Sequence, residues 1–224
     1  MCFDEQTSWT TFVLGTLFNI FLLWSFPTTS IIVICILWQY VLLMQIFEAL
    51  SWRSQTNRSS LTHFWASNGA FLANVTQPIV VGLLCLALFK NTSTKAKLIA
   101  VAVMLGYIIW LIYKSNKISP VGELTPNPDC SHLNLSWWDK MSFEIGDATV
   151  HGAVPYFICL YSVLFLLLRP TNLMLFSMCY ITVAFLISAC MYTCGTGSVW
   201  CWLAAFAPLF TWLYCKYAEP NGVI

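Results

Sequence analysis

The chain has 224 residues, of which 59% are hydrophobic and only 8% are charged. Soluble globular domains carry about 25% charged residues, so this composition excludes a compact water-soluble fold. The formal net charge is +1 and the sequence has no basic cluster, which gives no basis for a nucleic-acid partner. The composition therefore predicts an integral membrane protein in contact with the lipid bilayer.

The N-terminal segment lacks the features of a cleaved signal peptide. Asp4 and Glu5 lie within the first eight residues, and no basic residue accompanies them. The first region of a signal peptide is positively charged. We therefore expect the first apolar stretch to stay in the membrane as a transmembrane helix.

Seven apolar stretches have the length of a membrane span. A spanning helix needs about 20 mostly apolar residues, because all backbone groups must be satisfied within the segment. Pro78 interrupts the third stretch and predicts a tilt or a kink there. The sequence thus predicts one all-helical domain, residues 1–224, with these seven transmembrane helices: Trp9–Phe26, Ser30–Trp52, Phe64–Phe89, Ala96–Tyr113, Val150–Leu168, Thr171–Tyr192 and Ser198–Tyr217.

Two parts of the chain resemble each other. Phe26-Pro-Thr-Thr-Ser precedes the second stretch, and Arg169-Pro-Thr-Asn-Leu precedes the sixth. Pro78 in the third stretch also has a counterpart, Pro208, in the seventh. This pattern favours two parallel three-helix repeats joined by the fourth helix, an arrangement found in SWEET-type transporters. Chance similarity between apolar segments is the alternative.

The long polar connection, residues 114–149, is predicted to lie outside the membrane. Ser136 and Asp139 have the spacing of a helix cap, which favours an amphipathic helix on the membrane surface. The alternative is a loop with scattered aromatic residues. The apolar residues at helical spacing are Leu135, Trp138, Met141 and Ile145.

Orientation is predicted from modification sites, because the basic residues divide evenly between the two sides and do not decide it. The sequons at Asn57 and Asn134 lie on the same side as the N-terminus, whereas a competing sequon at Asn91 lies on the other. We therefore predict that the N-terminus lies outside and the C-terminus inside.

A polar stripe on the second stretch is the first candidate site. Trp38, Gln45, Glu48 and Trp52 share one helical face. A carboxylate inside a membrane is costly and often functional. Glu48 is therefore predicted either to face the bundle interior as a functional group or to reach the nearby interface.

Polar side chains on the third stretch form the second half of this site. Asn74 and Gln77 lie on one face of the predicted helix. Such groups commonly hold helices together, each contributing about 0.6 kcal/mol. The functional alternative is that they face Glu48 and line a pocket for a solute.

Metal and disulfide sites are weaker predictions. His151 and Glu48 could contribute to a metal site with acidic loop residues, but the sequence contains no compact metal-binding motif. Cys2 and Cys201 lie near the same predicted membrane face. A bond between them would close a loop of about 200 residues, worth up to about 5 kcal/mol. The alternative is two free thiols.

Four segments resemble, in order, a family of bacterial multi-span proteins that begin Met-Cys-Phe-Ser. They are the opening Met1-Cys2-Phe3, the segment Gln45-Ile-Phe-Glu48-Ala-Leu-Ser-Trp52, the Gln77-Pro78 region and Ser198-Val-Trp-Cys201. The family has Gln-x-x-Glu-Gly-x-x-Trp and Ser-Val-Trp-Cys-Phe at the second and fourth. This chain departs from it at Asp4 and Ala49. The resemblance implies a multi-span topology, supplies no activity, and emphasises Cys2, Glu48, Trp52, Trp200 and Cys201.

The leading functional hypothesis is a small-solute transporter or a ligand-binding membrane protein rather than an enzyme. Two alternatives remain: a metal-dependent membrane-embedded hydrolase, and a structural membrane protein of a virion or an organelle envelope. The sequence indicates no particular cofactor. The predicted solute-binding residues are Gln45, Glu48, Trp52, Asn74 and Gln77.

Overall fold

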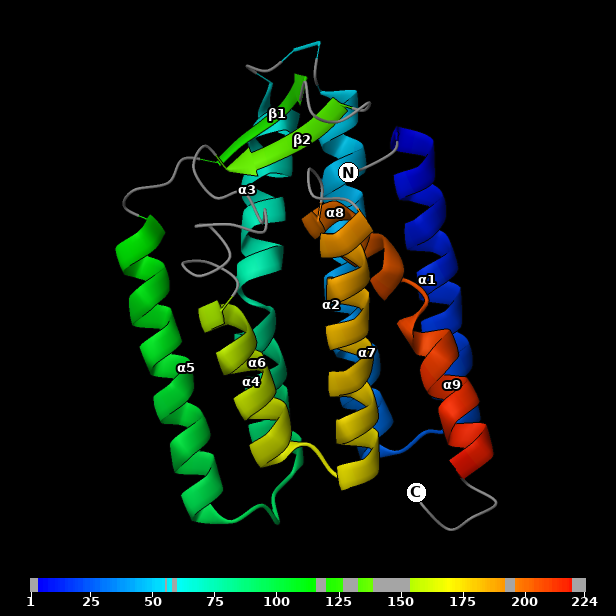
Figure 1. Cartoon of the computed structure of the whole chain (residues 1–224), viewed down its shortest axis with the longest axis vertical. Coiled ribbons are helices and arrows are strands. Elements are labelled where there is room, and N and C mark those ends of the chain that lie inside the picture. Colours follow the sequence, from blue (N-terminus) through cyan, green and yellow to red (C-terminus); the bar gives the residue numbers. More distant parts are fainter. Residues whose placement is uncertain are drawn as a thin grey trace.

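The computed structural model describes residues 4–54, 56–57, 60–115, 120–126, 133–138, 154–191 and 196–218. Within them the chain forms a bundle of helices with a two-stranded hairpin at one end (Figure 1). The helices are α1 (Glu5–Ser25), α2 (Thr29–Arg53), α3 (Leu61–Val75), α4 (Gln77–Leu88), α5 (Thr94–Ser115), α6 (Val154–Leu167), α7 (Thr171–Met191), α8 (Thr196–Ala204) and α9 (Ala207–Ala218).

Short polar side chains start several of these helices. Asp4 accepts a hydrogen bond from the backbone N–H of Thr7 at 2.6 Å, and Ser60 accepts one from His63 at 3.1 Å. These side chains satisfy N–H groups that have no partner in the first turn of a helix. The helices α1 and α3 therefore each begin at a side-chain cap.

Four helices are long and apolar enough to cross a membrane: α1, α2, α5 and α7. The pair α3 and α4 adds a fifth span if both belong to one bent segment. The helix α6 has only 14 residues, and the last predicted span is divided into α8 and α9, with 9 and 12 residues. The structure thus supports several spans, whereas the predicted total of seven is not confirmed.

The bend predicted at Pro78 is confirmed. The axes of α3 and α4 differ by 54° across Thr76. Pro78 lies at the start of α4, where its missing N–H costs nothing, but its ring prevents α3 from continuing through this point. The Tyr107 hydroxyl of α5 donates a hydrogen bond to the Val75 carbonyl at 2.9 Å, which satisfies an acceptor at the break.

A similar break divides the last predicted span. The helix α8 ends at Ala204, and α9 begins at Ala207 with Pro208 as its second residue. The Tyr180 hydroxyl of α7 donates to the Leu203 carbonyl at 2.7 Å. Both breaks therefore combine a proline with a tyrosine from another helix that satisfies a backbone acceptor nearby.

The helix α2 lies at the centre of the described bundle. It packs against α1, α3, α4, α8 and α9. The helix α6 packs against α4, α5 and α7, and α1 also contacts α9 (Figure 1). Because α2 touches most of the other helices, its polar residues are the ones best placed to lie inside the protein.

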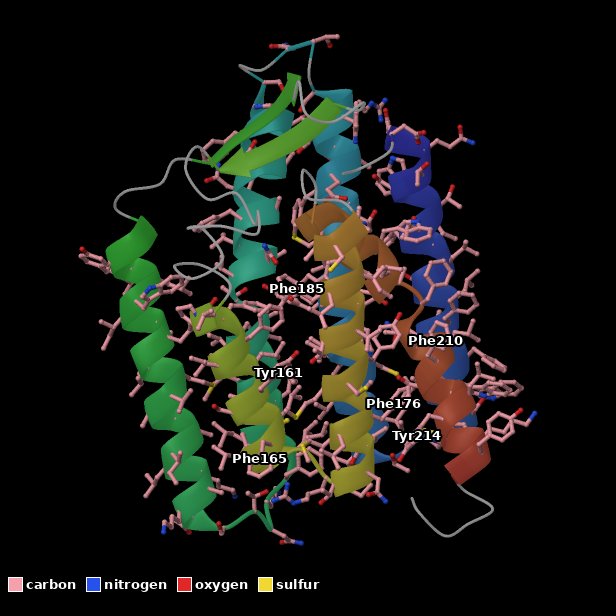
Figure 2. All side chains as sticks on the ribbon, viewed as in Figure 1. Tyr161, Phe165, Phe176, Phe185, Phe210 and Tyr214 are labelled. Carbon is pink, nitrogen blue, oxygen red and sulfur yellow. The ribbon has the colours of Figure 1, made fainter. Side chains whose placement is uncertain are left out.

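Aromatic pairs join α7 to its neighbours (Figure 2). Phe176 stacks on Tyr214 of α9, with ring centroids 4.4 Å apart. Phe185 contacts Phe157 of α6 edge-on at 4.7 Å. Offset and edge-on aromatic pairs each contribute about 0.5–1.5 kcal/mol beyond area burial, so they favour one arrangement of these helices.

Large apolar side chains cover the outer surface of the bundle. Trp24 of α1 is 81% exposed, Ile109 of α5 is 68% exposed and Phe165 of α6 is 60% exposed (Figure 2). Continuous apolar surface of this kind is unfavourable in water and is favourable against lipid tails. The chain is therefore a helical protein with several candidate transmembrane helices, in contact with a lipid bilayer.

The hairpin corrects one prediction. Strands β1 (Pro120–Pro126) and β2 (Leu133–Trp138) pair antiparallel, with Leu124 opposite Leu135. Ser136 therefore lies inside a strand and does not cap an amphipathic helix. The remaining residues of that predicted helix, Met141 and Ile145, lie outside the described residues.

Candidate functional site

The polar stripe on α2 is buried. Gln45 is 2% exposed and Glu48 is 1% exposed, with Trp38 on the same face at 2%. Trp52 is half-buried in the last turn of the helix. Of the two predicted positions for Glu48, the structure therefore shows the interior one.

Gln77, the first residue of α4, reaches the same interior across the bend. Its side chain is fully buried, and the Tyr156 hydroxyl of α6 donates a hydrogen bond to its Oε1 atom. Asn74 is also buried, in the last turn of α3 beside the break. The bend at Thr76 therefore places polar groups from two helix ends within the bundle.

The helix α8 completes the cluster from the other end of the sequence. Trp200 lies edge-on to Tyr156, with ring centroids 6.0 Å apart. The next residue, Cys201, is buried and lies close enough to Glu48 for the two side chains to interact electrostatically. We call this group the polar cluster; it consists of Gln45, Glu48, Gln77, Tyr156, Trp200 and Cys201.

Several buried hydrogen-bond donors in and beside the polar cluster have no partner among the described residues. They are the Nε2 atoms of Gln45 and Gln77 and the Nε1 atoms of Trp38, Trp52 and Trp200. Most buried polar groups in native proteins are paired, and each unpaired one costs about 1–3 kcal/mol. Three of these donors, in Gln45, Gln77 and Trp200, lie within the polar cluster, and their N–H groups call for acceptors.

The polar groups lie in one half of the bundle. Three contacts align α2 with α3: the Ser54 hydroxyl lies 3.0 Å from Nδ1 of His63, the Phe47 ring lies against Gly69, and Tyr40 bonds Thr76 at 2.6 Å. The polar cluster therefore lies between the Ser54–His63 pair and the middle of the bundle, and this pair is close to the end of the bundle that carries the N-terminus.

The opposite half of the core is mostly apolar, with the buried amide of Asn19 donating to the Cys35 carbonyl at 3.1 Å. Ile31 and Ile34 of α2 lie there with α6 residues Leu164 and Leu167, all at most 1% exposed. The buried serine of the neighbouring α7, Ser177, donates to the Leu173 carbonyl of its own helix at 2.8 Å. Access to the polar cluster is therefore more favourable from the N-terminal end, where Ser54 and His63 lie, than through the apolar half.

The predicted metal site gains no support from the described part of the chain. No group of three or more His, Cys, Asp or Glu side chains there is arranged to hold a metal ion. His151 lies outside the described residues, so only Glu48 of the predicted pair is placed.

Cys201 is a free, fully buried thiol in the structure, and Cys2 lies outside the described residues. Two free thiols were the predicted alternative to a disulfide, and the structure describes only one of these two residues, Cys201. The Cys2–Cys201 bond itself stays a prediction.

Sequence reasoning missed Tyr156, which connects Gln77 to Trp200. Tyr156 begins an apolar stretch directly after Pro155, and such a tyrosine ordinarily marks the end of a span. Only the packing of α6 against α4 shows that its hydroxyl points inward.

In a comparison with known protein families, curated proteins and solved structures, nothing matches the chain.

Proposed function

We propose that the chain is a seven-span membrane protein that binds a small polar solute at the polar cluster, as a transporter or a receptor-like binding protein. The unpartnered buried N–H donors of Gln45, Gln77 and Trp200, which belong to the polar cluster together with Glu48, carry this proposal. Purely structural polar contacts between helices satisfy one another, whereas a binding site leaves groups ready for its ligand. Gln45, Glu48 and Gln77 would bind directly, with Trp52 and Asn74 at the margins.

The seven spans follow from adding two segments to the five that length and composition support. The helix α6 is one, and the broken pair α8–α9 is the other. The paired proline breaks at Thr76 and Ala205 also favour two parallel repeats, with α5 between them. The resemblance to the Met-Cys-Phe-Ser family fits the same site, because it emphasises Glu48, Trp52 and Trp200.

We further propose that the end of the bundle carrying Lys90 and Arg169 faces the cytoplasm. These two side chains line one surface hollow of about 620 Å³. Lys216, in the last turn of α9, lies at the same end (Figure 1). Because the basic residues of the whole sequence divide evenly between the two sides, this orientation is supported by the sequon at Asn57, which follows α2 at the opposite end.

An odd number of spans places the two termini on opposite sides of the membrane. A tag on the N-terminus and a tag on the C-terminus are therefore expected to show opposite protease accessibility in sealed vesicles of one orientation. The measurement uses intact vesicles and detergent-opened vesicles from the same preparation. Equal accessibility of the two tags would contradict the seven-span topology and, with it, the parallel repeats.

Solute binding is tested by native mass spectrometry of the whole protein released from lipid nanodiscs. We expect an adduct of small mass on the wild type that is depleted in Gln77→Leu, because leucine keeps the volume and removes the amide. Asn68→Leu is the control, since Asn68 bonds the Phe64 carbonyl of its own helix at 2.8 Å. No adduct, or an adduct equally present in both variants, would contradict binding at the polar cluster.

A further inference from the structure

The surface hollow of about 620 Å³ at the end of the bundle opposite the hairpin has the lining of an anion site. Thr29 of α2, residues 88–93 between α4 and α5, and Arg169 between α6 and α7 surround it. We call it the basic hollow, after Lys90 and Arg169. We propose that it binds a phosphate group, carried either by an anionic phospholipid headgroup or by a soluble phosphate ester. This site is separate from the polar cluster and does not depend on it.

Hydrogen bonds between distant parts of the chain hold the walls of the basic hollow. The Ser30 hydroxyl of α2 donates to the Arg169 carbonyl, which joins the start of α2 to the connection between α6 and α7. The Lys97 ammonium of α5 donates to the Lys90 carbonyl at 2.8 Å. Figure 1 shows these connections together at the end opposite the hairpin. The two basic residues are therefore held on facing walls before any ligand binds.

Both cations keep their charge available. The Nη1 group of Arg169 donates to the carbonyls of Phe165 and Leu168, at 3.3 and 2.8 Å, near the end of α6. These acceptors are neutral, and a guanidinium has further N–H donors on its other two nitrogens. Neither Arg169 nor Lys90 forms an ion pair within the described residues, and both are exposed. A ligand with negative charge can therefore pair with both.

No acidic residue lines the basic hollow. In the described part of the chain, the acidic residues are Asp4, Glu5, Glu48 and Glu123, all in segments near the other end of the bundle. Glu48, for example, lies about 28 Å along α2 from Thr29. Glu219, which follows α9, lies outside the described residues. Cations in a concave surface without nearby carboxylates concentrate positive potential there and attract anions.

The other polar groups of the basic hollow favour phosphate among the anions. The helices α2 and α5 begin at its wall, next to Thr29 and Ser93, and helix N-termini attract phosphate through their partial positive charge. The amide of Asn91 and the hydroxyl of Thr92 add neutral donors. Arginine binds phosphate oxygens in pairs, and lysine binds them as a point charge. A phosphate group therefore offers enough charged acceptors for donors on several walls.

The size and the apolar part of the basic hollow also suit a phospholipid headgroup. Its volume lies within the range of small-molecule sites in proteins. Leu88 lines the hollow and is 42% exposed, which gives an acyl chain an apolar contact beside the headgroup. Basic pockets between membrane helices are known sites for phosphorylated lipid headgroups. A soluble phosphate ester would use the same cations without this apolar contact.

The test is native mass spectrometry of the full protein released from nanodiscs that mix phosphatidylcholine with phosphatidylglycerol. A phospholipid source is expected to give retained phosphatidylglycerol on the wild type. A soluble source is tested in phosphatidylcholine nanodiscs with added glycerol 3-phosphate, which has the phosphate without acyl chains. In the arm that shows binding, Lys90→Gln and Arg169→Gln should each weaken it about fivefold, because each removes one cation from the hollow.

Lys216→Gln is the matched control, because it removes one positive charge at the same end of the bundle without touching the basic hollow. The Lys216 ammonium lies 4.9 Å from the centre of the Trp212 ring of its own helix. An equal loss in Lys216→Gln and Lys90→Gln would indicate diffuse attraction and would overturn the site, as would a wild type that binds neither probe. Gln77→Leu should leave the phosphate ligand bound, so this site and the solute site can fail separately. Size-exclusion profiles of the variants confirm folding.

Discussion

Glu48→Gln is expected to weaken the binding of the proposed solute at the polar cluster by about tenfold or more, with the protein still folded. Glutamine has nearly the same shape as glutamate, so the packing of α2 against α8 should persist. The substitution replaces one carboxylate oxygen with an amide N–H group, beside the unpartnered amide N–H groups of Gln45 and Gln77. Losing a hydrogen bond to a charged group costs about 1.5–3 kcal/mol, which corresponds to at least a tenfold loss.

The measurement compares the solute adduct on the variant and on the wild type by native mass spectrometry from lipid nanodiscs. Glu5→Gln is the control, because Glu5 lies in the first turn of α1 and is not part of the polar cluster. Folding can be followed with a thiol-reactive dye once the exposed Cys179 and Cys190 are blocked, since the buried thiols, such as that of Cys201, react only when the bundle opens. An undiminished solute adduct on a folded Glu48→Gln protein would remove Glu48 from the site.

The sequence predicted the central helix well because its signal is strong. Ser30–Trp52 was expected and α2 runs from Thr29 to Arg53. Its apolar run is long and continuous, and polar residues with turn-forming residues bound it at both ends. The bend at Pro78 was equally predictable, because proline excludes an unbroken helix wherever it occurs in the interior of one.

Short segments were harder to predict, because the apolar residues in a stretch as short as the six residues of β2 can fit both the helical repeat and the alternation of a strand. Leu135 and Trp138 have helical spacing, but Leu133 and Leu135 have the alternation of a strand, and the chain forms β2 there. The last predicted span, Ser198–Tyr217, reads as one apolar run. The break between α8 and α9 depends on local backbone geometry and on the Tyr180 hydroxyl, a partner from a different helix.

The candidate site was predictable in part for a related reason. Helical periodicity alone places Gln45 and Glu48 on one face, and the cost of a polar group in lipid turns that face inward. Periodicity within one helix does not reveal which other helices meet it. Tyr156 and Trp200 join the polar cluster only through the packing of α6 and α8, more than 100 positions along the chain.

Gly69→Leu is expected to destabilise the bundle by about 1–3 kcal/mol, the usual cost of overpacking a buried contact. A Cβ atom at Gly69 would lie 2.2, 2.5 and 2.6 Å from three ring atoms of Phe47. Either α2 and α3 must move apart, or the ring must leave its position next to Glu48. The absence of a side chain at this position thus lets the two helices approach closely, as small residues do between membrane helices.

Thermal unfolding monitored with the thiol-reactive dye measures this effect, and two further variants identify its cause. Gly106→Leu is the control, because a Cβ atom there meets nothing within 4 Å and leucine favours a helix over glycine. Its melting temperature should be unchanged or raised. The double variant Phe47→Ala/Gly69→Leu should recover part of the lost stability, since the leucine can occupy the space of the missing ring. If Gly69→Leu instead unfolds at the wild-type temperature, α2 and α3 do not make this contact in the membrane, and the positions derived for Gln45 and Glu48 relative to α3 fail with it.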